Sequence, residues 1–564
     1  MFYRTAGPSA TGSAVGSEPP VAPAGMLVTP VQAVACPSGS RRAGGSALVC
    51  GPAGGGGLAS GDQVVLWHPV AVAPVKVKRD GSVLAGAWVP EHARLGVLEE
   101  ALGTGTIEEL CARYGLAVRR RRLICPAFVV RCVLAATLMP GADWIEVQMR
   151  LAGLLAGAPL ARPWHPVGAG DLARRRAKIP VAVFKDLFWG LAGPVDDGGG
   201  PGLRWRGLLV CATDGFLTRV PDTPANRAHF GSAGTSDDSA PFPQAQAQIV
   251  CVAGNRAALG AAWGAASASE QALTWRLVNE HPEIFAPGRV IIFDRCWPGA
   301  GLVAAIARLG AHVICRLKSG LDFPLDGPCG DGSHATHLDT EAGPLPARLI
   351  DYHLDTPRDQ AGGDRDPDEC YTLLTTLTGP GAYPAAEIAA LYPARWSGVE
   401  SLIGENKSAI TDAGPSRGPM LRSRSPDQVD QEMYAWLAAC QALRITGHGA
   451  LRAAARVPVR ARGGARDVSG DPVTARELPF TLARREAIRS IMCNAAATPA
   501  HLAAACAAAW RHILARLHPR RATRHKPRVC KWRPAFPAPK TRPVTVTGAT
   551  TITLFGVPAA AGTS

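Results

Sequence analysis

Three carboxylates stand where metal-dependent chemistry is expected. Asp214 follows the apolar run LLVCAT and Asp294 follows RVIIF, so each is predicted to close a buried strand at the rim of an α/β sheet. Glu400 lies in a later segment that is expected to be helical. Mg²⁺ prefers oxygen ligands, and two ions about 3.5–4 Å apart can activate a water or a 3′-hydroxyl in phosphodiester chemistry. Acids that only cap turns in α/β loops would give the same pattern.

The segment around Glu400 is LYPARWSGVESLIGENK, residues 391–407. Tyr392, Trp396 and Glu400 are four residues apart, which places them on one face of a regular helix, and Lys407 returns to that face two turns later. Two glycines weaken the helix by roughly 1 kcal/mol each, Gly398 and Gly404. An amphipathic helix with solvated charges is the simpler interpretation of this segment taken alone.

The elements that must position these acids can be read from residue 205 onward. Apolar, strand-like runs occur at LLVCAT, AQIVCVAG, RVIIF, HVICRLK and CYTLLTTLTG. Residues 259–280 and 299–309 lie between them and have helical patterns. Strands that alternate with helices predict a mostly parallel α/β sheet. Residues 321–369 are rich in Gly, Asp and Pro and are expected to be an insertion or long loop before the last helix.

Composition divides the chain into four parts. Residues 1–88 are of low complexity and are expected to be a disordered extension. Residues 89–200 predict a helical domain with Arg clusters at 119–122 and 174–176, which either contact DNA phosphates or form solvated faces. Residues 201–446 would be the catalytic domain. Residues 447–564 are helical and then basic, with ten Lys and Arg within 516–542.

Bulk composition narrows the class of protein. The 564 residues carry a formal net charge of +15, which favours a polyanionic partner, nucleic acid first, although a GC-rich genome also enriches Arg. The 15 cysteines form no CxxC pair and no Cys/His zinc spacing, which indicates a reducing compartment. The sequence contains no run of 18 uncharged apolar residues, so it predicts no membrane-spanning helix. A cytoplasmic protein with no membrane partner is therefore expected.

Three stretches resemble DDE transposases of the insertion-sequence-4 group, of the bacterial type common in actinobacteria. They are ATDGFLTRVPDTPANRAHFG, then IIFDRCWPGAGLVAAIARLGAHVICRLKSG, and the 391–407 segment with its Tyr, Arg, Glu and Lys. The resemblance implies a ribonuclease-H-like core with an insertion before the last catalytic helix. It also implies Mg²⁺-dependent cleavage at terminal inverted repeats, with Mn²⁺ as a substitute, and strand transfer into target DNA.

Carried over residue by residue, the resemblance assigns two sets of positions. Asp214, Asp294 and Glu400 match the three acids, which in the family are both catalytic and metal-binding. Tyr392, Arg395 and Lys407 match the positions that the family uses near DNA phosphates. Double-stranded DNA is the implied partner, a homodimer the implied synaptic unit, and the nucleoid the implied location.

The sequence departs from the family pattern at three points. Four residues separate Arg395 from Glu400 where the family has three, which would turn Glu400 by about 100° unless Arg395 precedes the first helical turn. Glu405 is therefore an alternative third acid. Phe216 and Trp297 replace the Thr and Phe that are usual beside the first two acids. The altered spacing, Phe216 and the Gly/Pro-rich N-terminus keep open a DNA-binding remnant without activity. A nuclease of the same fold that cuts without joining is a further alternative.

Overall fold

The computed structural model describes the chain in separate ranges. These are 76–77, 83–84, 93–116, 124–152, 165–195, 202–232, 242–295, 297–318, 321–355, 371–410, 421–454, 473–493, 498–518 and 551–554. The Arg cluster at 119–122 and most of the basic stretch 516–542 lie outside the described residues, as does the extension 1–88 apart from a short strand pair. That pair consists of β1 (Lys76–Val77) and β2 (Val83–Leu84).

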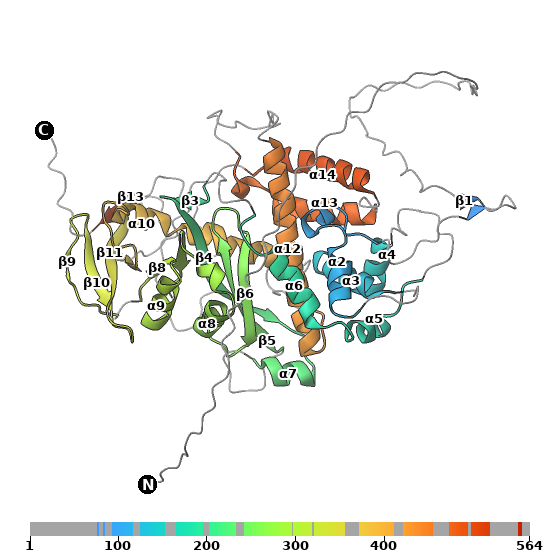
Figure 1. The fold of residues 1–564 in the computed structure, drawn as a ribbon, viewed down its shortest axis with the longest axis horizontal. Coiled ribbons are helices and arrows are strands. Elements are labelled where there is room, and N and C mark those ends of the chain that lie inside the picture. Colours follow the sequence, from blue (N-terminus) through green and yellow to red (C-terminus); the bar gives the residue numbers. More distant parts are fainter. Residues whose placement is uncertain are drawn as a thin grey trace, which may run out of the picture. The chain divides into compact units, whose positions relative to one another are not determined.

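A five-stranded core sheet has the order β6-β5-β4-β7-β8. Figure 1 labels four of these strands, β4, β5, β6 and β8. Its strands are β4 (Leu208–Arg219), β5 (Gln244–Val252), β6 (Ala258–Ala265), β7 (Arg289–Phe293) and β8 (His312–Arg316). The first three form an antiparallel meander, and β7 and β8 then add in parallel beside β4. This is the ribonuclease-H-like arrangement that the resemblance implied. The expectation of a mostly parallel sheet is wrong, because β4–β7 and β7–β8 are the only parallel pairs among the described strands.

The segment that was expected to be one helix over 259–280 is a strand followed by a helix. β6 covers its first part, and α8 (Glu270–Glu280) begins only after a turn. The sequence ALGAAWGA has helix-forming alanines and no β-branched residue, which explains the wrong prediction. The small residues allow close packing in the sheet, since a Cβ on Gly260 would lie 2.4 Å from Ile284 Cδ1 and 2.8 Å from Trp189.

The predicted insertion extends the sheet rather than forming a loop. β12 (Tyr371–Thr375) pairs with β8, and β11 (Leu345–Asp355), β10 (Ser333–Leu338) and β9 (Gly327–Pro328) follow outward, all antiparallel. Two short strands lie off this path: β13 (Thr551–Leu554) on β11 and β3 (Arg204–Trp205) on β4. The expectation was correct in placing extra chain here and wrong in leaving out its strands.

Helices cover both faces of the core sheet. Alternate strand residues such as Cys211, Val252 and Ile291 face α8 and α9 (Ala300–Arg308), with a short 3-10 turn, η3 (Pro282–Phe285), beside them. Their neighbours along the strands face a larger helical layer. That layer consists of α1 (Leu98–Leu102), α2 (Thr106–Arg113), α3 (Pro126–Leu138), α4 (Trp144–Leu151), α5 (Ala169–Arg176), α6 (Val181–Leu191), α12 (Pro426–Ala454), α13 (Phe480–Met492) and α14 (Pro499–Leu514).

The N-terminal helices form where the sequence predicts them. Pro126 begins α3 in the first-turn position that proline favours. Asp143 caps α4, with its carboxylate accepting a hydrogen bond from the amide of Glu146. These helices share one hydrophobic core with α12 and with a face of the sheet, and residues 72–564 form one compact unit. The four-part division of the chain stays a prediction.

Of the Arg cluster at 174–176, one member does not face solvent. Arg176 is 3% exposed, and its Nε donates to Gln431 Oε1 at 2.7 Å, which ties α5 to α12. Arg174 and Arg175 pair with Asp171 on the same helix. The cluster therefore offers at most two of its three arginines to a phosphate.

Three further features complete the description: the cysteines, the hydropathy of the helices and two short elements. The ten cysteines among the described residues are free, and most are buried. None of the described helices is both long enough and apolar enough to span a membrane. The remaining short elements are α7 (Pro224–Phe230) and the 3-10 turn η6 (Ala475–Glu477).

The segment that carries Glu400 is not a regular helix. After α10 (Ala385–Leu391), residues Trp396–Glu400 form a π-helical turn, η5, which leads into α11 (Ser401–Ile410). η5 packs on β4 and β5. Gly398 makes this possible, because a Cβ there would lie 2.7 Å from Ala253 Cα and 3.0 Å from Ala253 Cβ. The backbone of Ala253 cannot move aside as the end of a flexible side chain would.

The two glycines of this segment give a matched test of the packing. We expect Gly398→Ala to destabilise the protein by about 1–3 kcal/mol, because the added methyl group forces η5 off the sheet. We expect Gly404→Ala in α11 to stabilise it by up to about 1 kcal/mol, because nothing lies within 4 Å of the new Cβ and alanine favours the helix. Urea unfolding of both variants measures the difference. Equal effects of the two substitutions would show that η5 does not rest on Ala253.

Candidate metal centre

Asp214 lies within a strand rather than at its end. β4 continues to Arg219, and Asp214 stays paired with Ile249 of β5. The expectation that Asp214 closes the strand is wrong, because β4 extends beyond its pairing with β7, which covers only Leu209–Ala212. Asp214 therefore stands just beyond the end of the parallel pair, where its carboxylate is 17% exposed. Asp294 directly follows β7, as expected.

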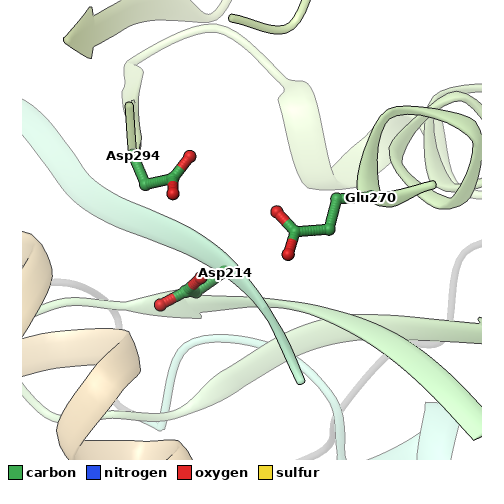
Figure 2. A group of neighbouring side chains, drawn as sticks. All are labelled: Asp214, Glu270 and Asp294. Atoms are coloured by element: carbon green, nitrogen blue, oxygen red, sulfur yellow. The ribbon is translucent and has the colours of Figure 1, made fainter. Parts of the chain in front are cut away.

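A third carboxylate joins these two aspartates, and it is not the one that the sequence predicted. Asp214, Glu270 and Asp294 each offer an oxygen within 4.8 Å of the others. Figure 2 shows the three side chains around one space, carried by β4, by the start of α8 and by the segment after β7. Glu400 is not a member of this set, which is the only such group among the described residues.

Sequence analysis missed Glu270 because it placed this residue inside a longer helix. In the structure Glu270 is the first residue of α8, and Ser269 caps the helix by accepting from the amide of Ala272. The Ser-Glu pair is a recognisable helix start. That signal was hidden because the alanine-rich strand β6 immediately before it also has a helical composition.

Arg395 joins Asp214 to Glu400. Its Nη1 donates to Asp214 Oδ2 at 3.1 Å and its Nη2 donates to Glu400 Oε1 at 2.9 Å. The Arg395 side chain is 8% exposed, whereas that of Glu400 is 45% exposed. The structure thus brings the three predicted acids into one neighbourhood, with Glu400 connected through a guanidinium.

The π-helical turn accounts for the additional residue between Arg395 and Glu400. A π-helix closes after five residues instead of four, so a side chain at i+5 lies near the side chain at i. Arg395 itself has helical φ and ψ of −54° and −47°. Arg395 therefore does not precede the first helical turn, and the wider turn restores the shared face instead.

Glu405, the alternative third acid, lies in a different set of contacts. It pairs with Arg256, and its Oε2 is 3.3 Å from Arg444 Nη2 on α12. These two ion pairs tie α11 to the end of the β5–β6 turn and to the helical layer. Glu405 is not among the carboxylates of the metal-compatible set.

The remaining predicted residues differ in burial, in their contacts and in whether the structure describes their side chains. Tyr392 is 5% exposed, and burial raises the pKa of its hydroxyl to about 12, against the lowering effect of Arg395 and Arg316. Trp396 lies beside Arg395, with the guanidinium carbon 5.9 Å from the ring centroid, so the packing contact and the carboxylate contacts of Arg395 coexist. Lys407 belongs to α11, but its side chain lies outside the described residues.

The two unusual residues beside the acids pack against other aromatic side chains. Phe216 meets Trp436 of α12 edge-on, with ring centroids 5.7 Å apart. Trp297 meets Phe323 at 5.5 Å, also edge-on. Neither residue displaces a carboxylate, so neither departure supports an inactive remnant.

The pKa values of the carboxylates reflect burial and mutual repulsion. Burial raises the pKa of Asp214 to about 6; Arg395 and the Gly215 amide oppose this, while Asp294 and Glu400 add to it. Burial, together with repulsion from Asp294 and Asp214, raises the pKa of Glu270 to about 7, against the lowering effect of Arg395. A cation among these groups would relieve the repulsion. Their chemistry fits a hard divalent ion, since every donor is a carboxylate oxygen.

Comparisons with known proteins identify two matching families. The model described as insertion element 4 transposase N-terminal matches residues 92–189, and the transposase DDE domain matches residues 205–439. The transposase InsG of insertion sequence element IS4 from Escherichia coli K12 is 24% identical over 360 residues, which cover 62% of this chain and 75% of that protein. A solved piggyBac transposase synaptic complex with hairpin DNA covers 77% of this chain and 84% of its own, at 11% identity and a TM-score of 0.36.

The raised pKa of Glu270 predicts how stability depends on pH in the absence of metal. Between its ordinary value of 4.5 and about 7 the folded chain holds a proton that the unfolded chain releases, so this group's stabilising effect is lost as pH rises through that window. We expect the Tm in EDTA to fall from pH 5 to 7.5, and the fall to be shallower in Glu270→Gln. Glu341→Gln, at an exposed turn, should match the wild type. An unchanged slope in Glu270→Gln would contradict the shift.

Proposed function

The chain belongs to the insertion-sequence-4 family of DDE transposases, enzymes that cut and join DNA with a divalent metal, and we propose that Asp214, Asp294 and Glu400 are its catalytic carboxylates. We propose that the ion is Mg²⁺, with Mn²⁺ as a substitute. The substrate would be the terminal inverted repeats of the element that encodes the protein, and the freed 3′-ends would be joined to target DNA.

The observation that carries this assignment is the double contact of Arg395. One guanidinium bonds Asp214 at 3.1 Å and Glu400 at 2.9 Å, although these acids are far apart in the sequence. Asp294 shares the 4.8 Å neighbourhood of Asp214. Glu405 is held by Arg256 and Arg444 instead, which favours Glu400 as the third acid.

Each side chain would have a distinct part in the reaction. A bound divalent ion supplies a Lewis acid that polarises the phosphoryl oxygen and lowers the pKa of the attacking hydroxyl or water. Asp214 and Asp294 would hold it with fixed carboxylates, because both sit on or beside buried strands. Glu400, the most exposed of the three, is the one best placed to respond to the arrival of DNA.

Arg395, Tyr392 and Lys407 would contact the phosphates of the DNA. Arg395 is charged at any working pH and presents a planar fork of donors that suits both carboxylates and phosphates. A phosphate near Glu400 would therefore compete for a group that now neutralises the acids. We further propose that the N-terminal helices contact DNA, that a homodimer forms when two ends are brought together, and that the protein works at the nucleoid in the cytoplasm.

A cleavage and strand-transfer assay on end-containing DNA tests the assignment. Asp214→Asn, Asp294→Asn and Glu400→Gln should each lower the cleavage rate by at least about a hundredfold with Mg²⁺, because losing a ligand should cost more than losing a residue that only hydrogen-bonds to a ligand. Glu405→Gln and the surface control Glu341→Gln should keep most of the activity.

Two results would contradict the assignment. Wild-type activity in Asp214→Asn would exclude metal-dependent catalysis at this centre. Loss of activity in a folded Glu405→Gln variant, together with retained activity in Glu400→Gln, would show that Glu405 and not Glu400 is the third acid. Nicked products without joined products would indicate a nuclease that does not transfer strands.

A further inference from the structure

Glu270 occupies a position that is specific to the start of a helix. It is the first residue of α8, an 11-residue helix that packs on β5 and β6, and Ser269 fixes the helix start by capping. Partial positive charge at a helix N-terminus stabilises a carboxylate there. Because α8 packs on the sheet, the backbone of Glu270 has a fixed position relative to β5 and β6.

Gly215 makes room for the Glu270 carboxylate. A Cβ at position 215 would lie 2.3 Å from Glu270 Oε1, 2.5 Å from Cδ and 2.6 Å from Cγ. Gly215 is part of β4 and is not among the residues with positive φ, so conformational freedom does not explain this glycine. Space explains it: the residue after Asp214 has no side chain, and the carboxylate of Glu270 takes the volume.

The carboxylates of Asp214 and Glu270 lie within 4.8 Å of that of Asp294, whereas Glu400 is outside this set and bonds Arg395. Asp214 uses Oδ2 for Arg395, and its Oδ1 accepts from the Gly215 amide at 2.9 Å. Glu400 Oε1 accepts from the same Arg395. Of the described acids, it is Glu270 that completes a set of three oxygens within 4.8 Å (Figure 2).

We propose that Glu270 supplies the third carboxylate of a divalent-ion site with Asp214 and Asp294, and that this site is complete without Glu400 and before DNA binds. Three carboxylates at this separation repel one another, and a single ion with hard-ligand preferences replaces the repulsion by attraction. The proposal rests on the assignment of Asp214 and Asp294 as metal ligands. It adds a residue that the three-acid pattern does not contain.

Titration of the full-length protein with Mn²⁺ in the absence of DNA tests it, with free Mn²⁺ followed by electron paramagnetic resonance. Glu270→Gln should weaken Mn²⁺ binding by at least about tenfold, the smallest loss expected even for an indirect partner of a metal ligand. The exposed control Glu341→Gln should bind as the wild type does, and Glu400→Gln should lose clearly less Mn²⁺ affinity than Glu270→Gln loses. Asp214→Asn should lose binding together with Glu270→Gln.

The outcomes separate the two proposals. Wild-type Mn²⁺ binding by Glu270→Gln, or a loss in Glu400→Gln as large as that in Glu270→Gln, would overturn this inference and leave the catalytic assignment standing. Wild-type binding by Asp214→Asn would overturn the assignment on which the inference rests.

Thermal unfolding distinguishes a ligand from a structural residue. If Glu270 is a ligand, Glu270→Gln should unfold in EDTA at or above the wild-type Tm, because the substitution removes repulsion. The increase in Tm that Mn²⁺ gives the wild type should then be much smaller in the variant. A lower Tm in EDTA with an unchanged Mn²⁺ response would assign Glu270 a structural role and overturn the inference.

Discussion

Mutual repulsion among carboxylates is the constraint around which the centre is built. Asp214, Asp294 and Glu270 lie within 4.8 Å of one another in a partly buried space, where like charges interact more strongly than in water. Arg395 offsets part of this charge, and its own 8% exposure is tolerable because it bonds carboxylates on two sides. Arg395 therefore neutralises part of the negative charge of these acids, and a divalent ion at this position would neutralise more of it.

The backbone around Arg395 is shaped by the same requirement. On a regular helix, the additional residue between Arg395 and Glu400 would turn the Glu400 side chain away from Arg395. The π-helical turn η5 places the two side chains on the same face again. The turn lies against the sheet at Gly398, where the backbone of Ala253 leaves no room for a side chain. Sequence spacing, backbone geometry and packing therefore agree on a single position for Glu400 relative to Asp214.

Sequence reasoning reached the features that depend on local patterns. It predicted β7 with Asp294 directly after it and the helices between residues 89 and 200, whereas the ribonuclease-H-like core was implied by the family resemblance. It missed β6 and Glu270 because alanine and glycine have no local preference for a strand, and only pairing with β5 makes this segment one. The extension of β4 past Asp214 likewise depends on a partner strand that no local pattern reveals.

The helical layer determines the site as directly as the sheet does. Phe216, two residues after Asp214, packs on Trp436 in the middle of the 29-residue helix α12. The same helix contacts α1, α3, α6 and α14, so the N-terminal helices and the acids rest on one shared core. A fragment that began at residue 201 would expose the apolar face beneath Asp214. We therefore expect correct placement of the carboxylates to depend on the N-terminal helices, although none of the described residues of these helices belongs to the carboxylate set.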